Sequence, residues 1–268
     1  MLLTNSIHPV SQRKLEEFCD VILAPDTKVE TLKMLIKGCD GLIVRSQLPD
    51  DIFEGVNNLK AVVRHGVGLD FIPVAAATRK KIPVANLPGS NTRAVVEYCL
   101  AVIFYFRRRL DQINEKLRHD GWNKTRPIAD SLTEIETSTL GIVGVGAIGS
   151  KISKISFDLG MDVIGFTRRP DSIPKGIKPV SKAELFKQSD IVIISCSLND
   201  ETRGMVDKTM IDLMKPTAIL INIARGPIVD SAAIVTALKE GRLGGAAMDV
   251  HDHHPLEGSE LVFNAPNL

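Results

Sequence analysis

Residues 140–149 carry the sequence LGIVGVGAIG, in which an apolar run passes directly into three glycines with the spacing G-x-G-x-x-G. An apolar run of this length predicts a buried strand, and the residues that follow predict a helix that begins at the glycines. In that setting Gly144 makes a tight turn, Gly146 lets the backbone approach a pyrophosphate, and Gly149 lets the helix pack against the strand. We therefore predict a dinucleotide-binding turn. The alternative is a glycine-rich turn of the kind found in any α/β protein.

The start of the predicted helix and the end of the next strand indicate which dinucleotide binds. Ala147 and Ile148 open the helix, whose unbonded N–H groups and positive dipole end attract phosphate. A site for NAD normally has Asp or Glu about 20 residues further on, which holds the ribose 2′-hydroxyl. This chain has Thr167, Arg168 and Arg169 there, and guanidinium groups pair with a 2′-phosphate that a carboxylate would repel. We expect NADP as the preferred cofactor and NAD as the second candidate. The alternative is that both arginines are solvated loop charges.

Short apolar runs alternate with helical stretches along the whole chain, which is typical of parallel sheets with crossover helices. A long apolar helix is expected over residues 91–109, between two series of strands. Residues 118–137 are polar and non-periodic, which suggests a linker or a dimer arm. The expected strands are residues 21–23, 41–44, 61–63 and 82–84 in the first series, and 140–143, 162–166, 191–195, 218–221 and 245–248 in the second.

Length and composition exclude several classes of protein. The 268 residues suffice for one large or two ordinary domains. The 33 basic and 32 acidic residues leave a formal net charge of +1 with no basic stripe, so no nucleic-acid partner is expected. The four cysteines form no C-x-x-C pair, so neither a zinc site nor a disulfide framework is indicated. With no signal-like start and no apolar run long enough to span a bilayer, we expect a cytoplasmic protein without a membrane partner.

Further motifs follow one another in the order found in one enzyme family. The second half contains INIARG at residues 221–226 and GGAAMDV at residues 244–250. The first half contains VRS at residues 44–46, RHGVGLD at 64–70, NLPGSN at 86–91 and VVE at 95–97. In these motifs the chain resembles the D-isomer-specific 2-hydroxyacid dehydrogenases, which include glyoxylate/hydroxypyruvate reductases and phosphoglycerate dehydrogenases, over essentially its whole length.

The resemblance implies a fold, a reaction and partners. The fold is α/β with two domains: a flavodoxin-like substrate domain at residues 1–92, and a Rossmann doubly wound nucleotide-binding domain at residues 93–268 that includes the interdomain helix. The reaction is hydride transfer between NADP(H) and a small 2-oxo or 2-hydroxy acid of the glyoxylate or hydroxypyruvate class, in the cleft between the domains. The expected assembly is a homodimer formed through the nucleotide-binding domain.

The resemblance also implies roles for individual residues. Arg225 matches the family's catalytic arginine, which grips the substrate carboxylate and carbonyl oxygen; the alternative is a surface charge at a strand end. Val67 and Gly68 match the loop whose N–H groups bind the carboxylate. Arg45 and His65 lie near that loop in the sequence, and for both a turn-stabilising or surface role is an equal alternative. The remaining matches are cofactor contacts: Asp249 at the nicotinamide end, Cys196, Ile223 and Ala224.

Two departures from the family pattern concern the proton donor. His254 stands where the family keeps a glutamate that holds the catalytic histidine protonated, and a neighbouring imidazolium lowers a histidine pKa instead of raising it. The chain also stops at Leu268, a few residues before the general-acid histidine would appear, so we expect a fragment or a truncated product of an ordinary enzyme. The alternative makes His254 the proton donor. We expect no metal site in the segment 251–254, because adjacent loop residues rarely converge on one ion.

A different class of function is compatible with the same fold. A catalytically impaired regulatory protein that senses NAD(P), or an inactive remnant of the family, would share every motif above, because fold alone does not determine function. Tight NADPH binding without turnover would favour the regulatory protein.

Overall fold

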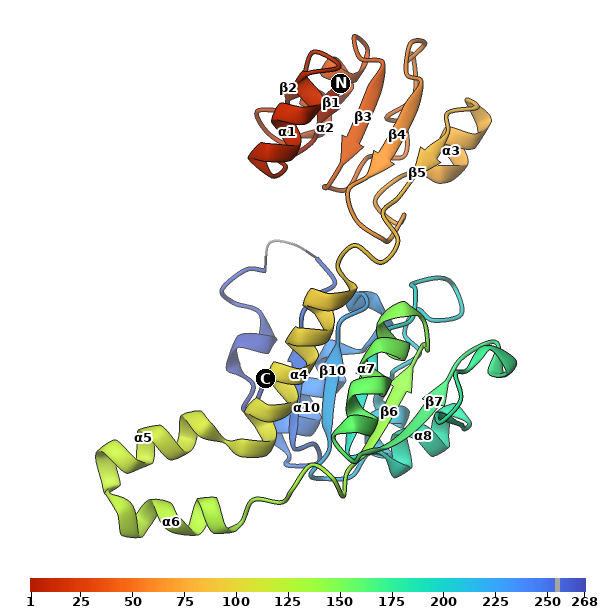
Figure 1. The fold of residues 1–268 in the computed structure, drawn as a ribbon. Coiled ribbons are helices and arrows are strands. Elements are labelled where there is room, and N and C mark those ends of the chain that lie inside the picture. Colours follow the sequence, from red (N-terminus) through yellow and green to blue (C-terminus); the bar gives the residue numbers. More distant parts are fainter. Residues whose placement is uncertain (254–255) are drawn as a thin grey trace. The chain divides into compact units, whose positions relative to one another are not determined.

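The structure is a computed structural model that describes residues 1–253 and 256–268. The chain divides into two compact units, Met1–Asn91 and Thr92–Leu268. Each unit has a parallel sheet with helices packed against it (Figure 1). Among the described residues, no helix is both long enough and apolar enough to cross a membrane.

The first unit has a five-stranded parallel sheet in the order β2-β1-β3-β4-β5, which is the flavodoxin-like order. Buried apolar side chains of the strands and helices form one core, which includes Ile36, Leu42 and Val62. The elements are β1 (Leu2–Leu3), α1 (Pro9–Glu16), β2 (Ile22–Leu23), α2 (Val29–Ile36), β3 (Gly41–Val44), β4 (Ala61–Arg64), α3 (Val74–Arg79) and β5 (Val84–Ala85).

The second unit has a six-stranded parallel sheet in the order β11-β10-β9-β6-β7-β8. Counted from the first strand of this unit, that order is the doubly wound order of Rossmann folds. The helices are α4 (Thr92–Arg108), α5 (Leu110–Asp120), α6 (Trp122–Asp130), α7 (Ala147–Asp158), α8 (Lys182–Gln188), α9 (Lys208–Asp212) and α10 (Ser231–Lys239). The strands are β6 (Thr139–Val143), β7 (Asp162–Phe166), β8 (Lys178–Pro179), β9 (Ile191–Ile194), β10 (Ile219–Asn222) and β11 (Gly245–Met248), and short 3-10 turns span Pro170–Ser172, Gly226–Ile228 and Leu261–Asn264.

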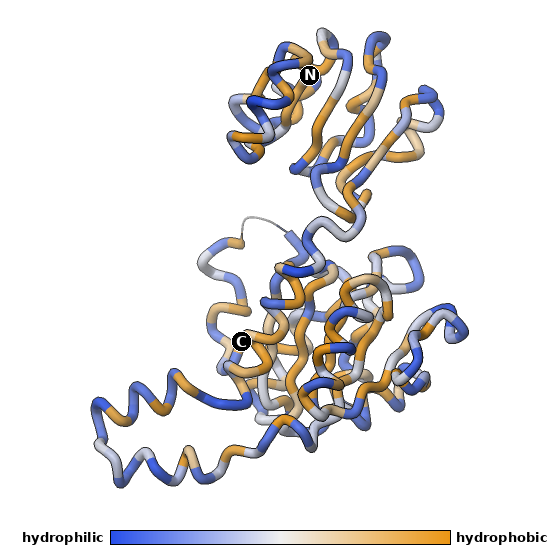
Figure 2. Tube along the Cα trace, viewed as in Figure 1, coloured by the Kyte–Doolittle hydropathy of each residue, from blue (hydrophilic) through white to orange (hydrophobic). Residues whose placement is uncertain are grey.

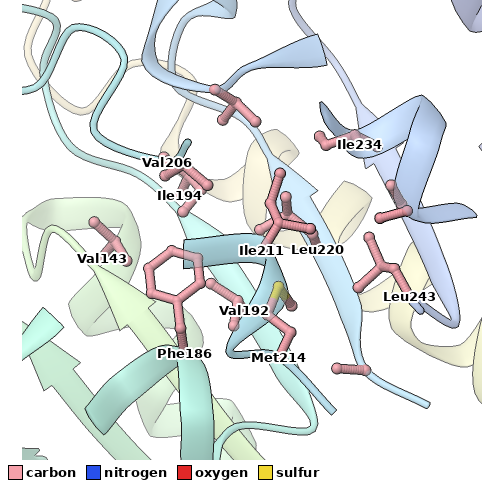
Figure 3. Packing of buried hydrophobic residues seen from close by; sticks show 14 of the residues in the cluster. Val143, Phe186, Val192, Ile194, Val206, Ile211, Met214, Leu220, Ile234 and Leu243 are labelled. Carbon is pink, nitrogen blue, oxygen red and sulfur yellow. The ribbon is translucent and has the colours of Figure 1, made fainter. Parts of the chain in front are cut away.

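The central strands of this sheet are covered on both faces. In β9, Ile191 and Ile193 pack with the side chains of α4 and α7, whereas Val192 and Ile194 pack with those of α8, α9 and α10. Figure 3 shows the second cluster, with Phe186 against Val192 and Ile194. The strands are accordingly hydrophobic along their length in Figure 2. Because successive side chains of a strand point to opposite faces, a strand without any polar position needs two covered faces.

The predicted fold class is confirmed, and the strands expected from the sequence are all present, with ends shifted by a few residues. Two short strands, β1 and β8, were not predicted. The interpretation of residues 118–137 as non-periodic was wrong, because α5 ends and α6 lies within this segment, and the two helices pack against each other as a hairpin (Figure 1). The buried side chain that α6 contributes is the polar Thr125, so the segment has no apolar core-facing stripe to give a periodic pattern.

Candidate functional site

The glycine turn connects β6 to α7. Gly144 has φ +93°, and its N–H donates to the Phe166 carbonyl at the end of β7, with 2.8 Å between the two atoms. A Cβ at Gly144 would lie 2.6 Å from the Cys196 backbone. A Cβ at Gly149 would lie 2.7 Å from the Gly144 carbonyl oxygen. The turn therefore needs glycine at both positions, one for its conformation and one for the close approach of α7.

Gly146 differs from the other two glycines, because its Cβ position has no atom of a described residue within 4 Å apart from its own neighbours in the chain and its helix. The backbone there borders open space at the start of α7, where the N–H groups of Ala147, Ile148 and Gly149 point out of the first helical turn. The cradle has the size and donor chemistry for a phosphate group, which a Cβ at Gly146 would obstruct. The turn therefore fits the pyrophosphate of a dinucleotide.

A cavity of about 220 Å³ continues from this turn along the carboxyl ends of β6, β7 and β9. Thr167, Arg168 and Cys196 line it together with Gly144 and Gly146. Ligands of doubly wound sheets bind at this edge, where the chain connections diverge to the two faces. A larger cavity of about 560 Å³ lies at the opposite edge of the sheet, beside Thr217 and Gly244, and none of the predicted site residues line it.

The arginines predicted to select the cofactor lie at the mouth of the smaller cavity. Arg168 is exposed, and its guanidinium lies 3.4 Å from the Glu201 carboxylate. Arg169 is exposed next to it and does not line the cavity. A bound 2′-phosphate would thus compete with Glu201 for Arg168. Sequence reasoning missed this carboxylate because it lies 33 residues away in the chain.

Ser195 and Cys196 line the cavity where it meets the end of β9. Burial raises the pKa of the Cys196 thiol, and the charge of Arg168 opposes that shift. The hydroxyl of Ser195 donates to the Gly144 carbonyl at 2.7 Å, which fixes the glycine turn from the end of β9. Ser195 was not among the predicted site residues; its place directly after a buried strand was the available signal.

Arg225 follows β10 on a turn that a buried amide organises. Asn222 is fully buried; its Nδ2 donates to the Arg225 carbonyl at 3.0 Å, and its Oδ1 accepts from the Ala224 N–H at 3.1 Å. Ile223 and Ala224 are buried between them, so only their backbone can face a ligand. The Arg225 side chain is half-buried and donates to the Ala224 carbonyl at 2.7 Å. Asn222, which the sequence analysis missed, thus fixes the backbone that carries Arg225.

The segment after β11 lies beside the same turn. The Asp249 N–H donates to the Asn222 carbonyl at 3.0 Å. Loss of hydration raises the pKa of the Asp249 carboxyl. On α4, burial raises the pKa of Tyr98 and of Cys99, and the negative charge of Asp249 raises both further. Asp249 therefore lies near Tyr98 and Cys99. A Cβ at Gly226 would lie 2.1 Å from the His251 backbone. Arg225 and Asp249 are therefore brought together at the carboxyl ends of β10 and β11.

Of the histidine-rich segment, the structure shows His253, whose Nε2 lies 2.7 Å from the Glu260 carboxylate. His254, the alternative proton donor, lies outside the described residues. Within residues 1–253 and 256–268, no group of three or more His, Cys, Asp or Glu side chains could hold a metal ion.

The predicted acid-binding residues of the first unit gather at the carboxyl ends of β3 and β4. Arg45 is exposed, and its guanidinium donates to the Ser6 carbonyl. Partial burial, with the charges of Arg45 and Arg64, lowers the pKa of His65. The loop continues through Val67, which is 40% exposed, and Gly68. Arg45 and His65 thus lie near the predicted carboxylate loop within this unit.

Comparison with known proteins shows what this chain is similar to. The family model "D-isomer specific 2-hydroxyacid dehydrogenase, NAD binding domain" matches residues 100–268. D-3-phosphoglycerate dehydrogenase of Methanocaldococcus jannaschii is 34% identical over 98% of this chain and 51% of its own length. Glyoxylate reductase of Aeropyrum pernix is 34% identical over the whole of this chain and 85% of its own.

A solved structure of an acyclic imino acid reductase, in complex with NADPH and D-Arg, superimposes with a TM-score of 0.89 at 27% identity. That match covers the whole of this chain and 87% of the reductase. The chain spans about half the length of the phosphoglycerate dehydrogenases that it matches. On the family model and the glyoxylate reductase match together, the chain belongs to the D-isomer-specific 2-hydroxyacid dehydrogenase family.

Proposed function

We propose that this protein is an oxidoreductase that transfers a hydride between NADP(H) and a small 2-oxo or 2-hydroxy acid of the glyoxylate or hydroxypyruvate class. The observation that carries the proposal is the open cradle at Gly146, which continues into the cavity bordered by Thr167 and Arg168. Membership of the family and similarity to a glyoxylate reductase support the substrate class.

In this proposal the second unit holds the cofactor. The backbone from Gly144 to Gly149 binds the pyrophosphate, and Thr167, Arg168 and Arg169 bind the 2′-phosphate. The buried wall of Cys196, Ile223 and Ala224 and the carboxylate of Asp249 border the nicotinamide half. When bound, the reduced nicotinamide supplies the hydride that reaches the carbonyl carbon of the substrate.

The acid is held by charge and by backbone donors. Arg225 binds the substrate carboxylate and stabilises negative charge that develops on the carbonyl oxygen. Within the first unit, the N–H groups of Val67 and Gly68 are the proposed backbone donors to a carboxylate, with Arg45 as a further cation. The half-burial of Arg225 supports its role, because fewer water molecules then compete for the guanidinium.

The cofactor preference is testable through two variants with opposite expected effects. Replacing Arg168 and Arg169 by Gln is expected to weaken NADPH binding at least about tenfold and to leave NADH binding within about twofold, because only NADPH has the 2′-phosphate. Glu201→Gln is the matched control and should strengthen NADPH binding, because it releases Arg168. Fluorescence titration of both cofactors measures this. Equal losses for NADPH and NADH in the double variant would overturn the preference.

Turnover tests the reaction itself. NADPH oxidation with glyoxylate and with hydroxypyruvate is expected, and Arg225→Gln is expected to lower kcat/KM at least about a hundredfold by removing stabilisation of the transition state. The same assay on His254→Ala decides whether that imidazole supplies the proton, since unchanged turnover excludes it. Tight NADPH binding without turnover of either acid would favour the regulatory alternative over the enzyme.

We also propose a homodimer formed through the second unit. The hairpin of α5 and α6 exposes Leu110 to 64%, Leu117 to 44% and Trp122 to 64%, and apolar side chains grouped in this way favour a protein partner. The double change Leu110→Glu and Leu117→Glu is expected to give a monomer in light scattering after size exclusion. Met34→Glu, at an exposed apolar residue of the first unit, should leave the dimer intact. A monomeric wild-type chain would contradict the proposal.

A further inference from the structure

The loop after β4 has every carbonyl from Arg64 to Leu69 bonded to a donor of the protein. Two of the donors belong to the Arg64 side chain: its Nη1 donates to the His65 carbonyl at 3.3 Å, and its Nε donates to the Gly68 carbonyl at 3.2 Å. The other four carbonyls accept from Gly66 N (Arg64 O, 2.9 Å), Leu87 N (Gly66 O, 2.9 Å), Asn86 Nδ2 (Val67 O, 2.7 Å) and Ile72 N (Leu69 O, 3.0 Å).

The N–H groups of residues 67–69 in this loop differ from its carbonyls in their hydrogen bonding. Among the residues that the structure describes, none accepts a hydrogen bond from the N–H groups of Val67, Gly68 or Leu69. A trans peptide places its N–H opposite the carbonyl of the preceding residue. Because the carbonyls of residues 66–68 are bonded to the protein, the three N–H groups that share their peptide planes face away from those bonds. Consecutive N–H groups in a turn can together bind an anion.

Within residues 1–253 and 256–268, Arg64 is the one side chain that donates to carbonyls on both sides of Val67, namely those of His65 and Gly68. Its Nη1 also donates to the Val44 carbonyl at 2.8 Å, at the end of β3. Its guanidinium lies over the Phe71 ring, 4.5 Å from the ring centre. It passes so close to Gly66 that a Cβ there would lie 3.3 Å from the guanidinium carbon. The planar guanidinium can bond several carbonyls at fixed angles, whereas an ammonium group cannot reproduce that geometry.

We propose that Arg64 is a positioning residue that orients the N–H groups of Val67, Gly68 and Leu69 toward the carboxylate of the substrate, with Leu69 as a third backbone donor. Through its bonds to the His65 and Gly68 carbonyls, Arg64 fixes the peptide group before and the peptide group after those that carry the Val67 and Gly68 N–H groups. Arg64 itself does not have to touch the acid. This inference rests on the proposed function, because it takes a small carboxylic acid as the ligand of the loop.

The test uses the full chain with NADPH present and oxalate as the probe, since oxalate has the size of a two-carbon oxo acid and presents a carboxylate to the loop. In the wild type, oxalate is expected to shift the ¹⁵N–¹H signals of Val67, Gly68 and Leu69. Arg64→Lys keeps the charge and the aliphatic stem but loses the planar fork. It is expected to weaken oxalate binding at least about tenfold and to reduce the three shifts. The matched control is Arg79→Lys, at an exposed arginine at the end of α3 in the same unit.

The outcomes separate this inference from the proposed function. If oxalate binds the wild type and Arg64→Lys equally well, with the same three shifts, the role of Arg64 is overturned and the proposed function stands. If oxalate leaves the three signals of the wild type unmoved although NADPH binds, the acid-binding part of the proposed function fails together with the inference. NADPH affinity should stay within about twofold in Arg64→Lys, because the proposed cofactor residues belong to the second unit.

A measurement on the wild type keeps the inference testable if Arg64→Lys does not fold. The Arg64 Nε–H should exchange with solvent far more slowly than the Nε–H of Arg79, both with and without oxalate, because its hydrogen bond to Gly68 is part of the preformed site. Exchange of the Arg64 Nε–H at the rate of Arg79 in the oxalate complex would overturn the inference.

Discussion

At the scale of single residues, replacing Gly146 or Gly149 by Ala is expected to affect different properties. The change at Gly146 should lower NADPH affinity, whereas the change at Gly149 should lower the free energy of unfolding. Gly146 has a negative φ and open space at its Cβ position, so Gly146→Ala should change the free energy of unfolding by less than about 0.5 kcal/mol. The new methyl group would lie where a phosphate binds, so NADPH affinity should fall at least about tenfold.

Gly149→Ala is the matched comparison. Its Cβ would lie 2.7 Å from the Gly144 carbonyl oxygen and 3.0 Å from Ile142, so the change should cost about 1–3 kcal/mol of unfolding free energy. Urea unfolding and NADPH titration of both variants separate the two effects. A stable Gly146→Ala variant that still binds NADPH normally would show that no phosphate occupies the cradle.

The motif residues could be predicted from the sequence, because the spacing of glycines between a strand and a helix has a local physical meaning. Ser195, Asn222 and Arg64 could not. Each of them acts through hydrogen bonds to backbone that only the fold brings near, as when Ser195 donates to Gly144, 51 residues earlier in the chain. Glu201 was missed for the same reason, although it lies beside Arg168.

At the scale of elements, the buried amide at the end of β10 is expected to be the main support of the turn that carries Arg225. Asn222→Ala would leave the Ala224 N–H and the Arg225 carbonyl without these bonds inside the protein, which should lower the free energy of unfolding by about 2 kcal/mol. Urea unfolding measures this, with Asn114→Ala on the exposed face of α5 as the control. A loss below about 0.5 kcal/mol would contradict the assigned support.

The central strands could be predicted because burial on both faces leaves only apolar residues in them, as in the sequence IVII of β9. The missed strand β8 consists of Lys178 and Pro179, which form no apolar run. The missed strand β1 has only Leu2 and Leu3 before the polar residues 4–6. The α5 and α6 hairpin shows the other limit. The buried side chain that α6 contributes is the polar Thr125, so no apolar core-facing stripe marks this helix, and Pro127 inside it argued against a helix there.

At the scale of the whole molecule, the buried clusters divide as the two units do. Among the described residues, the core of the first unit contains none beyond Val84, and the two clusters of the second unit contain none before Val95. We therefore predict that residues 92–268 alone fold and bind NADPH within about threefold of the full chain's affinity. Circular dichroism and NADPH titration of that segment test this. A segment that stays unfolded at saturating NADPH would show that its core depends on residues 1–91.

The close packing of Gly226 has a consequence for attempts to change which acid the proposed site would accept. The backbone at His251 and Asp252 occupies the space that any side chain at position 226 would need. A redesign that shifts the segment after β11 therefore also changes the support beneath Arg225, and one that enlarges residue 226 displaces that segment. The turn at Gly226 and the segment after β11 therefore have to be redesigned together, so that the backbone of one still fits the other. The walls of the cavity at the ends of β6, β7 and β9 can be altered separately.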